Sequence, residues 1–432
     1  MRYLAVTETC DLASLYVRLV GEGHQVKVHI SEPEARGTGL GLFTQIESWR
    51  DELGWIQAAG DDGIIIFESV SEGFGALQDT LRRDGYKVVG GSAFGDRLEN
   101  DRAFAQTQLG QHGLQIAPVY AFDSIAAANA FIVAQPARYV LKFSGPNFAS
   151  SDNYLGQRDD GSDVLAILAA HTLRGTTGQF ILMPFLRGVE VGVGAYFNGT
   201  RFILPACLDW EHKRFFAGDL GELTGEMGTV ATFDDTQDVF MRTLFKLEPL
   251  LRGRGHVGWI NLNTIVNADG IWPLELTCRF GYPGFAVLEP LQAIGWGELL
   301  KTIAGGFDTL LATHPGFSVG VVVTTPPFPY TRKQVAEPIG LPVWIDETLD
   351  DVAKANLHFG EIGLVDGRLV TSGLYGWTMV VTGTGATVAA AQLAAYSHLQ
   401  GIAIPNMRYR LDIGDKLRDG EFERLQRYLG KG

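Results

Sequence analysis

The sequence predicts a mixed fold, α/β in its first part and α+β further on, with a Rossmann-like domain at the N-terminus. Short apolar runs at residues 3–7 and 63–69 alternate with segments of helical periodicity, a pattern typical of βαβ units around a parallel sheet. The chain has 432 residues, enough for two to four domains of roughly 100–200 residues each. Residues 7–11 read TETCD where a dinucleotide-binding domain carries GxGxxG, so the first strand does not predict such a site.

Composition restricts the partners that this protein could have. Hydrophobic residues make up 46% and charged residues 19%, as in globular proteins. The net charge of −14 (35 Lys and Arg against 49 Asp and Glu) argues against nucleic acid as a partner. Three widely spaced cysteines predict no disulfide framework and favour a cytoplasmic location. Acidic residues interrupt the N-terminal segment, and no run of about 18 apolar residues occurs, so we expect neither a signal peptide nor a membrane span.

Beyond residue 98 longer strands and hairpins follow, and residue 317 marks a second change. We expect helices at 101–112, 124–134, 164–172, 237–251 and 387–399, a charged C-terminal helix, strands at 138–144, 179–185, 190–197, 318–325 and 377–383, and a short hairpin at 363–371. A longer hairpin is expected over 257–280, with its turn at 267–270. Residues 209–228 fit no regular element and are predicted to be a long loop.

Lys142 and the loop behind it are the first candidate site. The lysine lies on a predicted strand, and residues 144–156 are rich in Gly, Ser and Asn. An ammonium group and a cradle of backbone N–H groups suit a nucleotide phosphate, and Ser150 and Ser151 could add hydroxyl donors. The alternative is a surface lysine beside an ordinary loop, because the segment is no Walker A motif.

Residues 183–193 form a second candidate. Backbone groups at Phe185 and Leu186 could meet an adenine edge, while Glu190 on the next strand accepts from ribose hydroxyls. A plain β-turn followed by an edge carboxylate explains the same pattern.

The hairpin carries a third candidate, because Asn263 lies on one of its strands and Glu275 on the other. Glu275 lies in an otherwise apolar run, where a carboxylate is costly unless it meets a cation. Mg²⁺ held by side-chain oxygens and nucleotide phosphates would meet that need. A structural salt bridge to Arg279 is the alternative.

The long loop is the fourth candidate. His212, Lys213 and Arg214 stand near Asp219 and could bind a carboxylate or a phosphate, or they could form a solvated run of charges.

Three segments together resemble the ATP-grasp ligases, and specifically the glycinamide ribonucleotide synthetase (phosphoribosylamine–glycine ligase) family. They are residues 212–228 (HKRFFAGDLGELTGEMG), 274–284 (LELTCRFGYPG) and 358–414, which occur in the family's order. The resemblance implies a Rossmann-like, pre-ATP-grasp domain over 1–98, an ATP-grasp region over 99–317 and a small mixed α/β domain over 318–432.

The resemblance also implies a role for each candidate residue. Arg102, in place of a lysine, and Lys142 would contact the phosphates of ATP. Phe185 and Leu186 would line adenine, and Glu190 would hold ribose. Glu275 would bind Mg²⁺, or Mn²⁺ in its place, with Thr277 where the family has Asn and with Asn263 or water completing the shell. Arg279 would face the acceptor or the acyl phosphate, and with Lys213 it is a catalytic candidate.

The chemistry implied is amide formation. A carboxylate attacks the γ-phosphate of ATP, and an amine then displaces phosphate from the acyl phosphate. However, the family's GGREH is replaced by TETCD, its GLAAGKGV is absent after Lys142, and its DPE becomes YPG at 282–284. We therefore predict a ligase, monomeric or homodimeric, that joins a carboxylate such as glycine to an amine other than phosphoribosylamine. The alternatives are a true phosphoribosylamine–glycine ligase of purine biosynthesis and a non-catalytic nucleotide-binding homologue.

Overall fold

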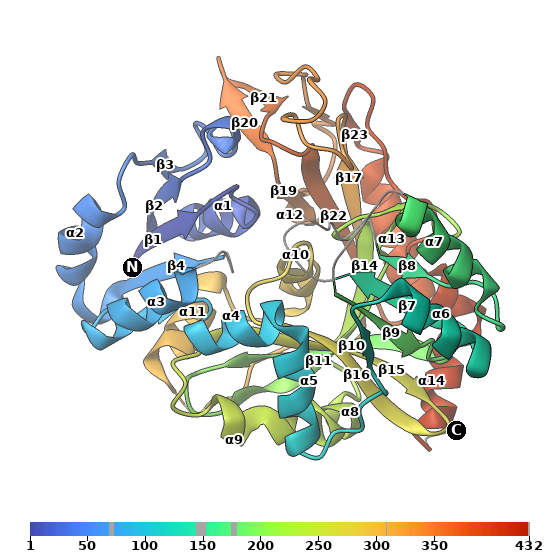
Figure 1. The fold of residues 1–432 in the computed structure, drawn as a ribbon. Coiled ribbons are helices and arrows are strands. Elements are labelled where there is room, and N and C mark those ends of the chain that lie inside the picture. Colours follow the sequence, from blue (N-terminus) through green and yellow to red (C-terminus); the bar gives the residue numbers. More distant parts are fainter. Residues whose placement is uncertain (69–72, 144–152, 174–178, 308, 431–432) are drawn as a thin grey trace. The chain divides into compact units, whose positions relative to one another are not determined.

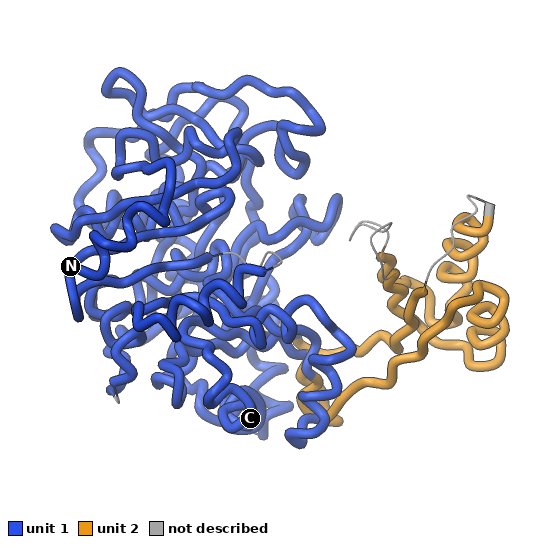
Figure 2. Tube along the Cα trace, turned by 60° about the vertical axis from the view of Figure 1, so that its left-hand side comes forward, with its two compact units in different colours: residues 1–114, 190–264, 273–432 blue, residues 115–189, 265–272 orange. Residues whose placement is uncertain are grey.

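The computed structural model describes all residues except 69–72, 144–152, 174–178, 308 and 431–432. By their contacts these residues form two units. Unit 1 comprises residues 1–114, 190–264 and 273–432, and unit 2 comprises residues 115–189 and 265–272 (blue and orange in Figure 2).

The N-terminal part of unit 1 is a five-stranded parallel sheet in the order β3-β2-β1-β4-β5 (Figure 1). Its strands are β1 (Arg2–Thr7), β2 (Gln25–Ile30), β3 (Thr44–Gln45), β4 (Gly63–Phe67) and β5 (Val88–Val89). The helices along this part are α1 (Ala13–Gly21), α2 (Leu53–Gln57), α3 (Phe74–Arg83), α4 (Ala93–Asn100) and α5 (Arg102–Gln111). The βαβ pattern predicted from the sequence is therefore confirmed.

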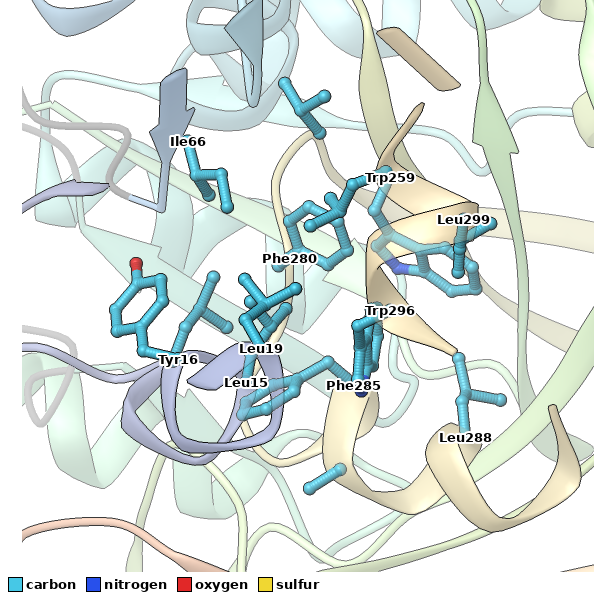
Figure 3. Close-up of a cluster of buried hydrophobic side chains, with 14 of the residues drawn as sticks. Leu15, Tyr16, Leu19, Ile66, Trp259, Phe280, Phe285, Leu288, Trp296 and Leu299 are labelled. Carbon is cyan, nitrogen blue, oxygen red and sulfur yellow. The ribbon is translucent and has the colours of Figure 1, made fainter. Parts of the chain in front are cut away.

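A hydrophobic core joins this sheet to later parts of unit 1. Leu15, Tyr16 and Leu19 of α1 lie in the same cluster as Trp259 and Trp296, and all five are at most 6% exposed (Figure 3). Helices α10 (Gly284–Leu288) and α11 (Trp296–Gly305) contribute eight buried residues to this cluster. Segments nearly 300 residues apart in sequence thus bury their apolar faces together.

The second sheet has eight strands in the order β16-β15-β10-β11-β14-β17-β22-β19. They are β10 (Val189–Phe197), β11 (Phe202–Glu211), β14 (Gly228–Thr232), β15 (Gly258–Asn267), β16 (Gly270–Thr277), β17 (Phe317–Thr324), β19 (Leu357–Phe359) and β22 (Trp377–Gly385). The β15–β16 hairpin and its turn are as predicted. Strands from the C-terminal hundred residues share this sheet with the central strands, because β14 pairs with β17 and β17 with β22.

The segment predicted as a long loop is instead largely β-structure. Residues 209–211 end β11, and a hairpin of β12 (Arg214–Phe216) and β13 (Leu220–Leu223) follows before β14. Gly218 and Gly221 adopt positive φ in and beside its turn, which explains why a glycine-rich stretch still forms a hairpin.

The helix predicted over 237–251 is interrupted. It forms α8 (Gln237–Arg242), a 3₁₀ turn at Leu244–Leu247 and α9 (Glu248–Leu251). Thr243 has φ −128° and ψ −95°, outside the helical region. Its hydroxyl donates to the Val239 carbonyl, and Pro249 opens α9, where a missing N–H is tolerated.

The remaining elements of unit 1 are β18 (Trp344–Ile345), α12 (Asp351–Ala355), β20 (Ile362–Val365), β21 (Arg368–Thr371), α13 (Val388–Leu399), β23 (Ile402–Ala403) and α14 (Phe422–Tyr428). Cys10, Cys207 and Cys278 are free and buried. No described helix combines the length and the apolar character that crossing a bilayer requires.

Unit 2 carries a four-stranded sheet in the order β6-β9-β7-β8 and two helices. The strands are β6 (Tyr120–Phe122), β7 (Tyr139–Phe143), β8 (Tyr154–Leu155) and β9 (Phe180–Pro184), and the helices are α6 (Ile125–Ala134) and α7 (Ser162–Leu173). Ala128, Ile132, Leu141 and Leu182 pack in its own core.

Candidate active site

A pocket of about 350 Å³ lies within unit 1, on one face of the eight-stranded sheet. Side chains alternate along a strand, so residues two apart share a face. Asp209 and Glu211 on β11, Asn261 and Asn263 on β15, and Glu275 and Thr277 on β16 all line it. Asn263, Glu275 and Thr277, the residues predicted to be metal ligands, therefore line the same pocket, and their role as ligands stays a prediction.

Strand β10 lies between β15 and β11, and its glycines leave space for the pocket on this face of the sheet. Gly192 and Gly194 carry no side chain, and a Cβ added at Gly192 would lie 2.2 Å from Asp209 Oδ1. The opening lets Asn261 Nδ2 donate to Asp209 Oδ2 over 2.6 Å, across the intervening strand.

Lys213 occupies the centre of a cluster of carboxylates. Its Nζ lies 2.9 Å from Glu211, 3.2 Å from Glu275 and 3.7 Å from Glu190. Burial alone would lower the pKa of Lys213, but the three carboxylates raise it above its ordinary value. One ammonium among three carboxylates leaves an excess of negative charge, which a further cation would offset.

The donor set fits a hard divalent cation. Asn263 Oδ1 is buried and has no hydrogen-bond partner among the described residues, and Glu275 and Thr277 present oxygens to the same pocket. Mg²⁺ prefers such oxygen ligands. No three acidic, His or Cys side chains among the described residues converge closely enough to hold a metal by themselves. Such an ion would need phosphate oxygens or water as additional ligands.

Two arginines flank this cluster. Arg102, the first residue of α5, donates to the Leu274 carbonyl over 3.2 Å and places Nη1 3.7 Å from Glu275 Oε2. Burial lowers its pKa, although Glu275 opposes that shift. Arg279 lines the pocket and pairs with Glu99 at 3.2 Å. Glu275 is thus ion-paired with Arg102 and Lys213, while the ion pair of Arg279 is with Glu99.

The other nucleotide candidates lie in unit 2 or outside the described residues. Lys142 is on β7, opposite Ile181 of β9. The backbone N–H of Phe185 donates to the Arg138 carbonyl, and the Arg138 guanidinium stacks 3.5 Å from the centre of the Phe185 ring. Leu186 follows in the turn after β9. Ser150 and Ser151 fall outside the described residues, and the phosphate and adenine roles of these residues stay predictions.

The neighbours of Lys213 in sequence, His212 and Arg214, have hydrogen-bond partners within unit 1. His212 is 1% exposed and its Nε2 accepts from the Gly414 N–H. Burial, together with nearby Lys416 and Arg410, lowers its pKa to about 4, so the ring is neutral at pH 7. Arg214 donates to the Gly221 carbonyl. This part of the motif connects the β12–β13 hairpin to the C-terminal segment.

Several residues of the pocket escaped the sequence analysis. Asp209, Asn261 and Glu226 line it, together with Trp259 and Trp377. The signal was present in the alternation of LDWE and INLN, where every second residue is polar or charged. The glycine-rich stretch that follows, up to residue 228, favours a loop and obscures the short alternation at residues 208–211.

Residues 100–285 match the family model described as phosphoribosylglycinamide synthetase, ATP-grasp (A) domain. The match includes every residue that lines the pocket except Asp11, Leu288 and Trp377. Residues 100–285 are therefore similar to the ATP-grasp domain of that family.

Over most of its length the chain resembles phosphoribosylamine–glycine ligase, as its three motifs predicted. The enzyme of Streptococcus pneumoniae is 29% identical over 359 residues, which cover 79% of this chain and 81% of the relative. The structure of phosphoribosylamine–glycine ligase from Thermotoga maritima aligns with a TM-score of 0.70 at 21% identity, covering 96% of this chain and all of that one. A biotin carboxylase domain from Hydrogenobacter thermophilus, determined with MgADP and bicarbonate, aligns with a TM-score of 0.65 at 12% identity, covering 99% and 97%.

Proposed function

We propose that this protein is an ATP-dependent carboxylate–amine ligase that uses ATP with Mg²⁺ or Mn²⁺. One observation carries the proposal: a single pocket gathers Glu275, Thr277 and Asn263 beside Lys213 and Arg279. Acid, amide and hydroxyl oxygens beside two cations are the groups that a bound triphosphate and its metal need. The similarity to phosphoribosylamine–glycine ligases supports the same reaction class.

The proposed reaction has two balanced steps. An oxygen of the carboxylate substrate attacks the γ-phosphorus of ATP, the bond to the β–γ bridging oxygen breaks, and ADP leaves. The amine nitrogen then attacks the acyl carbon, phosphate leaves, and the nitrogen loses a proton as the amide forms. Lys213 and Arg279 would offset the charge on the phosphoryl oxygens. The metal, held by Glu275, Asn263 and Thr277, would neutralise phosphate charge.

We propose the nucleotide contacts as the family resemblance implies them. Arg102 and Lys142 would contact phosphates, Phe185 and Leu186 would line adenine, and Glu190 would hold ribose. Glu190 is half exposed and accepts from Asn263 Nδ2 over 2.9 Å, so one carboxylate oxygen is already oriented. We also propose the division into regions 1–98, 99–317 and 318–432.

A second candidate is phosphoribosylamine–glycine ligase itself, and the names of the relatives favour it. The two candidates differ only in the amine. Glycine is the carboxylate to test first in both.

The test follows ADP release with ATP, Mg²⁺, glycine and other carboxylates, and a panel of amines that includes phosphoribosylamine. We expect ADP release that requires both a carboxylate and an amine. Glu275→Gln should lower the rate by about 100-fold or more, because a ligand of the metal is lost. Asp269→Asn, in the exposed turn of the same hairpin, is the control and should retain the rate.

Wild-type protein that binds ATP but releases no ADP with any pair would show a non-catalytic homologue. A fully active Glu275→Gln variant would remove the metal assignment.

A further inference from the structure

The pocket has a second part, which the proposed nucleotide chemistry does not use. Along β11 and β15 its residues form three rows across the sheet face, namely Glu211 with Asn263, Asp209 with Asn261, and Cys207 with Trp259. The first row lies beside Lys213 and the proposed metal ligands. The second and third rows lead away from them, from a carboxylate to an aromatic ring.

Glu226 adds a carboxylate to this second part and has no partner there. It lines the pocket and is 6% exposed. Its Oε1 is buried, and no described residue donates a hydrogen bond to its side chain. Burial raises the pKa of Glu226 well above its ordinary value, Glu211 and Asp209 raise it further, and Lys213 opposes the shift. A buried carboxylate without a partner is costly, and a ligand that supplies a cation would remove that cost.

The walls beside these acids are aromatic. Tyr282 and Trp377 stack with ring centroids 4.9 Å apart, and Trp259 stands on the floor of the pocket. Tyr282 Oη and Trp377 Nε1 are also buried without partners among the described residues. Aromatic faces attract organic cations, so the walls and the acids favour the same kind of ligand.

The charges of this pocket disfavour a phosphorylated amine in its second part. Its lining has five acidic side chains, those of Asp11, Asp209, Glu211, Glu226 and Glu275, against two basic ones, those of Lys213 and Arg279. Both cations are already in ion pairs with carboxylates. A phosphate placed beside Asp209 and Glu226 would lie among acidic side chains, and neither cation of the lining is free to pair with it.

Building on the ligase function proposed above, we infer that its amine substrate is a small organic cation without a phosphate group. Glu226 and Asp209 hold its ammonium group against Trp377. Glu226 and Asp209 are thus the residues that set specificity for the amine.

The test measures amine binding by calorimetry in the absence of nucleotide, so it does not depend on turnover. The probes are ethanolamine, putrescine and agmatine as cations, with O-phosphoethanolamine as the phosphorylated match of ethanolamine. We expect at least one cation to bind the wild type at least tenfold more tightly than O-phosphoethanolamine does. Glu226→Gln should weaken the binding of that cation by tenfold or more and leave ATP binding unchanged.

Two further variants keep the result interpretable. Asp209→Asn should weaken the binding of the same cation. Glu222 is an exposed acid four residues before Glu226, and Glu222→Gln should leave the binding unchanged. Thermal melts of each variant show that it is folded.

The outcomes separate the two proposals. Equal or tighter binding of O-phosphoethanolamine, no binding of any cation, or unchanged binding in folded Glu226→Gln would each overturn the amine assignment, even if ADP release is observed. Cation binding that depends on Glu226, without ADP release for any carboxylate, would support the site and count against the ligase function.

Discussion

The fold buries the carboxyl group of Asp209 at a site where its ionisation is unfavourable. Burial raises its pKa to about 7, and the neighbouring Glu211 adds to the shift, although Asn261 donates a hydrogen bond that opposes it. A costly charged group in a pocket is typical of a functional site, since stability alone would favour its removal.

This shift makes a prediction about stability and pH. Because the pKa of Asp209 is higher in the folded protein than the ordinary 3.8, the folded state binds more protons between about pH 4 and pH 7. The free energy of unfolding should therefore lose a contribution as pH rises through this range. Asp209→Asn removes that loss, so the variant should exceed the wild type in stability at pH 8 by on the order of 1–4 kcal/mol, and by less at pH 5.

Urea unfolding at pH 5 and pH 8 measures the difference. Asp84→Asn, which removes an exposed carboxylate of unit 1, is the control for the loss of one charge. If the free energy of unfolding changed equally for the wild type and for Asp209→Asn between pH 5 and pH 8, ionisation of Asp209 would not be the cause of the lost stability.

Among the elements, β10 depends on two glycines that face its neighbours. A Cβ added at Gly194 would lie 2.2 Å from Cζ2 of Trp259, which is 6% exposed in the core beneath the pocket (Figure 3). Such overpacking forces the ring or the strand to move.

Gly194→Ala should therefore lower the free energy of unfolding by about 1–3 kcal/mol. Gly54→Ala is the matched control, because nothing lies within 4 Å of a Cβ at that helical position. It should be neutral or stabilising by up to about 1 kcal/mol. Thermal and urea unfolding compare the two variants. Equal changes in their free energy of unfolding would show that the Trp259 ring moves aside without loss of stability.

The sequence was a good guide to elements whose pattern is local. The βαβ units, the β15–β16 hairpin and α13 follow directly from periodicity and turn residues. Local patterns fail where one residue breaks an element, as Thr243 does between α8 and the following turn. They fail again over 209–228, where glycines that looked like loop residues serve a hairpin.

The sequence predicted the residues of the candidate site that belong to a motif. It did not predict those that come together only through the order of strands in the sheet. Glu275, Thr277 and Asn263 lie on one hairpin, so their meeting follows from local pairing. Asp209 joins them only because β11 and β15 flank the glycines of β10, a sheet order that periodicity does not reveal. The sequence offered Lys213 as part of a segment that could bind a carboxylate or a phosphate, and its contacts with three carboxylates likewise arise from the tertiary fold.

At the scale of the whole molecule, unit 1 is assembled from three separate stretches of chain. Arg410 connects two of them. Its side chain is fully buried, it forms a bidentate pair with Asp412 at 2.7 Å, and it also donates to Asp219 and to the Arg214 carbonyl, each over 3.0 Å. The C-terminal segment thereby fixes the β12–β13 hairpin, which begins directly after Lys213.

Replacing Arg410 therefore tests how much this connection stabilises the protein. Arg410→Met keeps much of the volume but leaves Asp412 and Asp219 without their buried partner, which should lower the free energy of unfolding by about 3 kcal/mol. Arg418→Met breaks an exposed pair with Asp415 and should cost less than about 1 kcal/mol. Urea unfolding measures both variants at one pH.

Because Lys213 is adjacent to Arg214, folded Arg410→Met should also release ADP more slowly than Arg418→Met. Equal stability and equal rates in the two variants would show that the C-terminal segment does not hold the site in place.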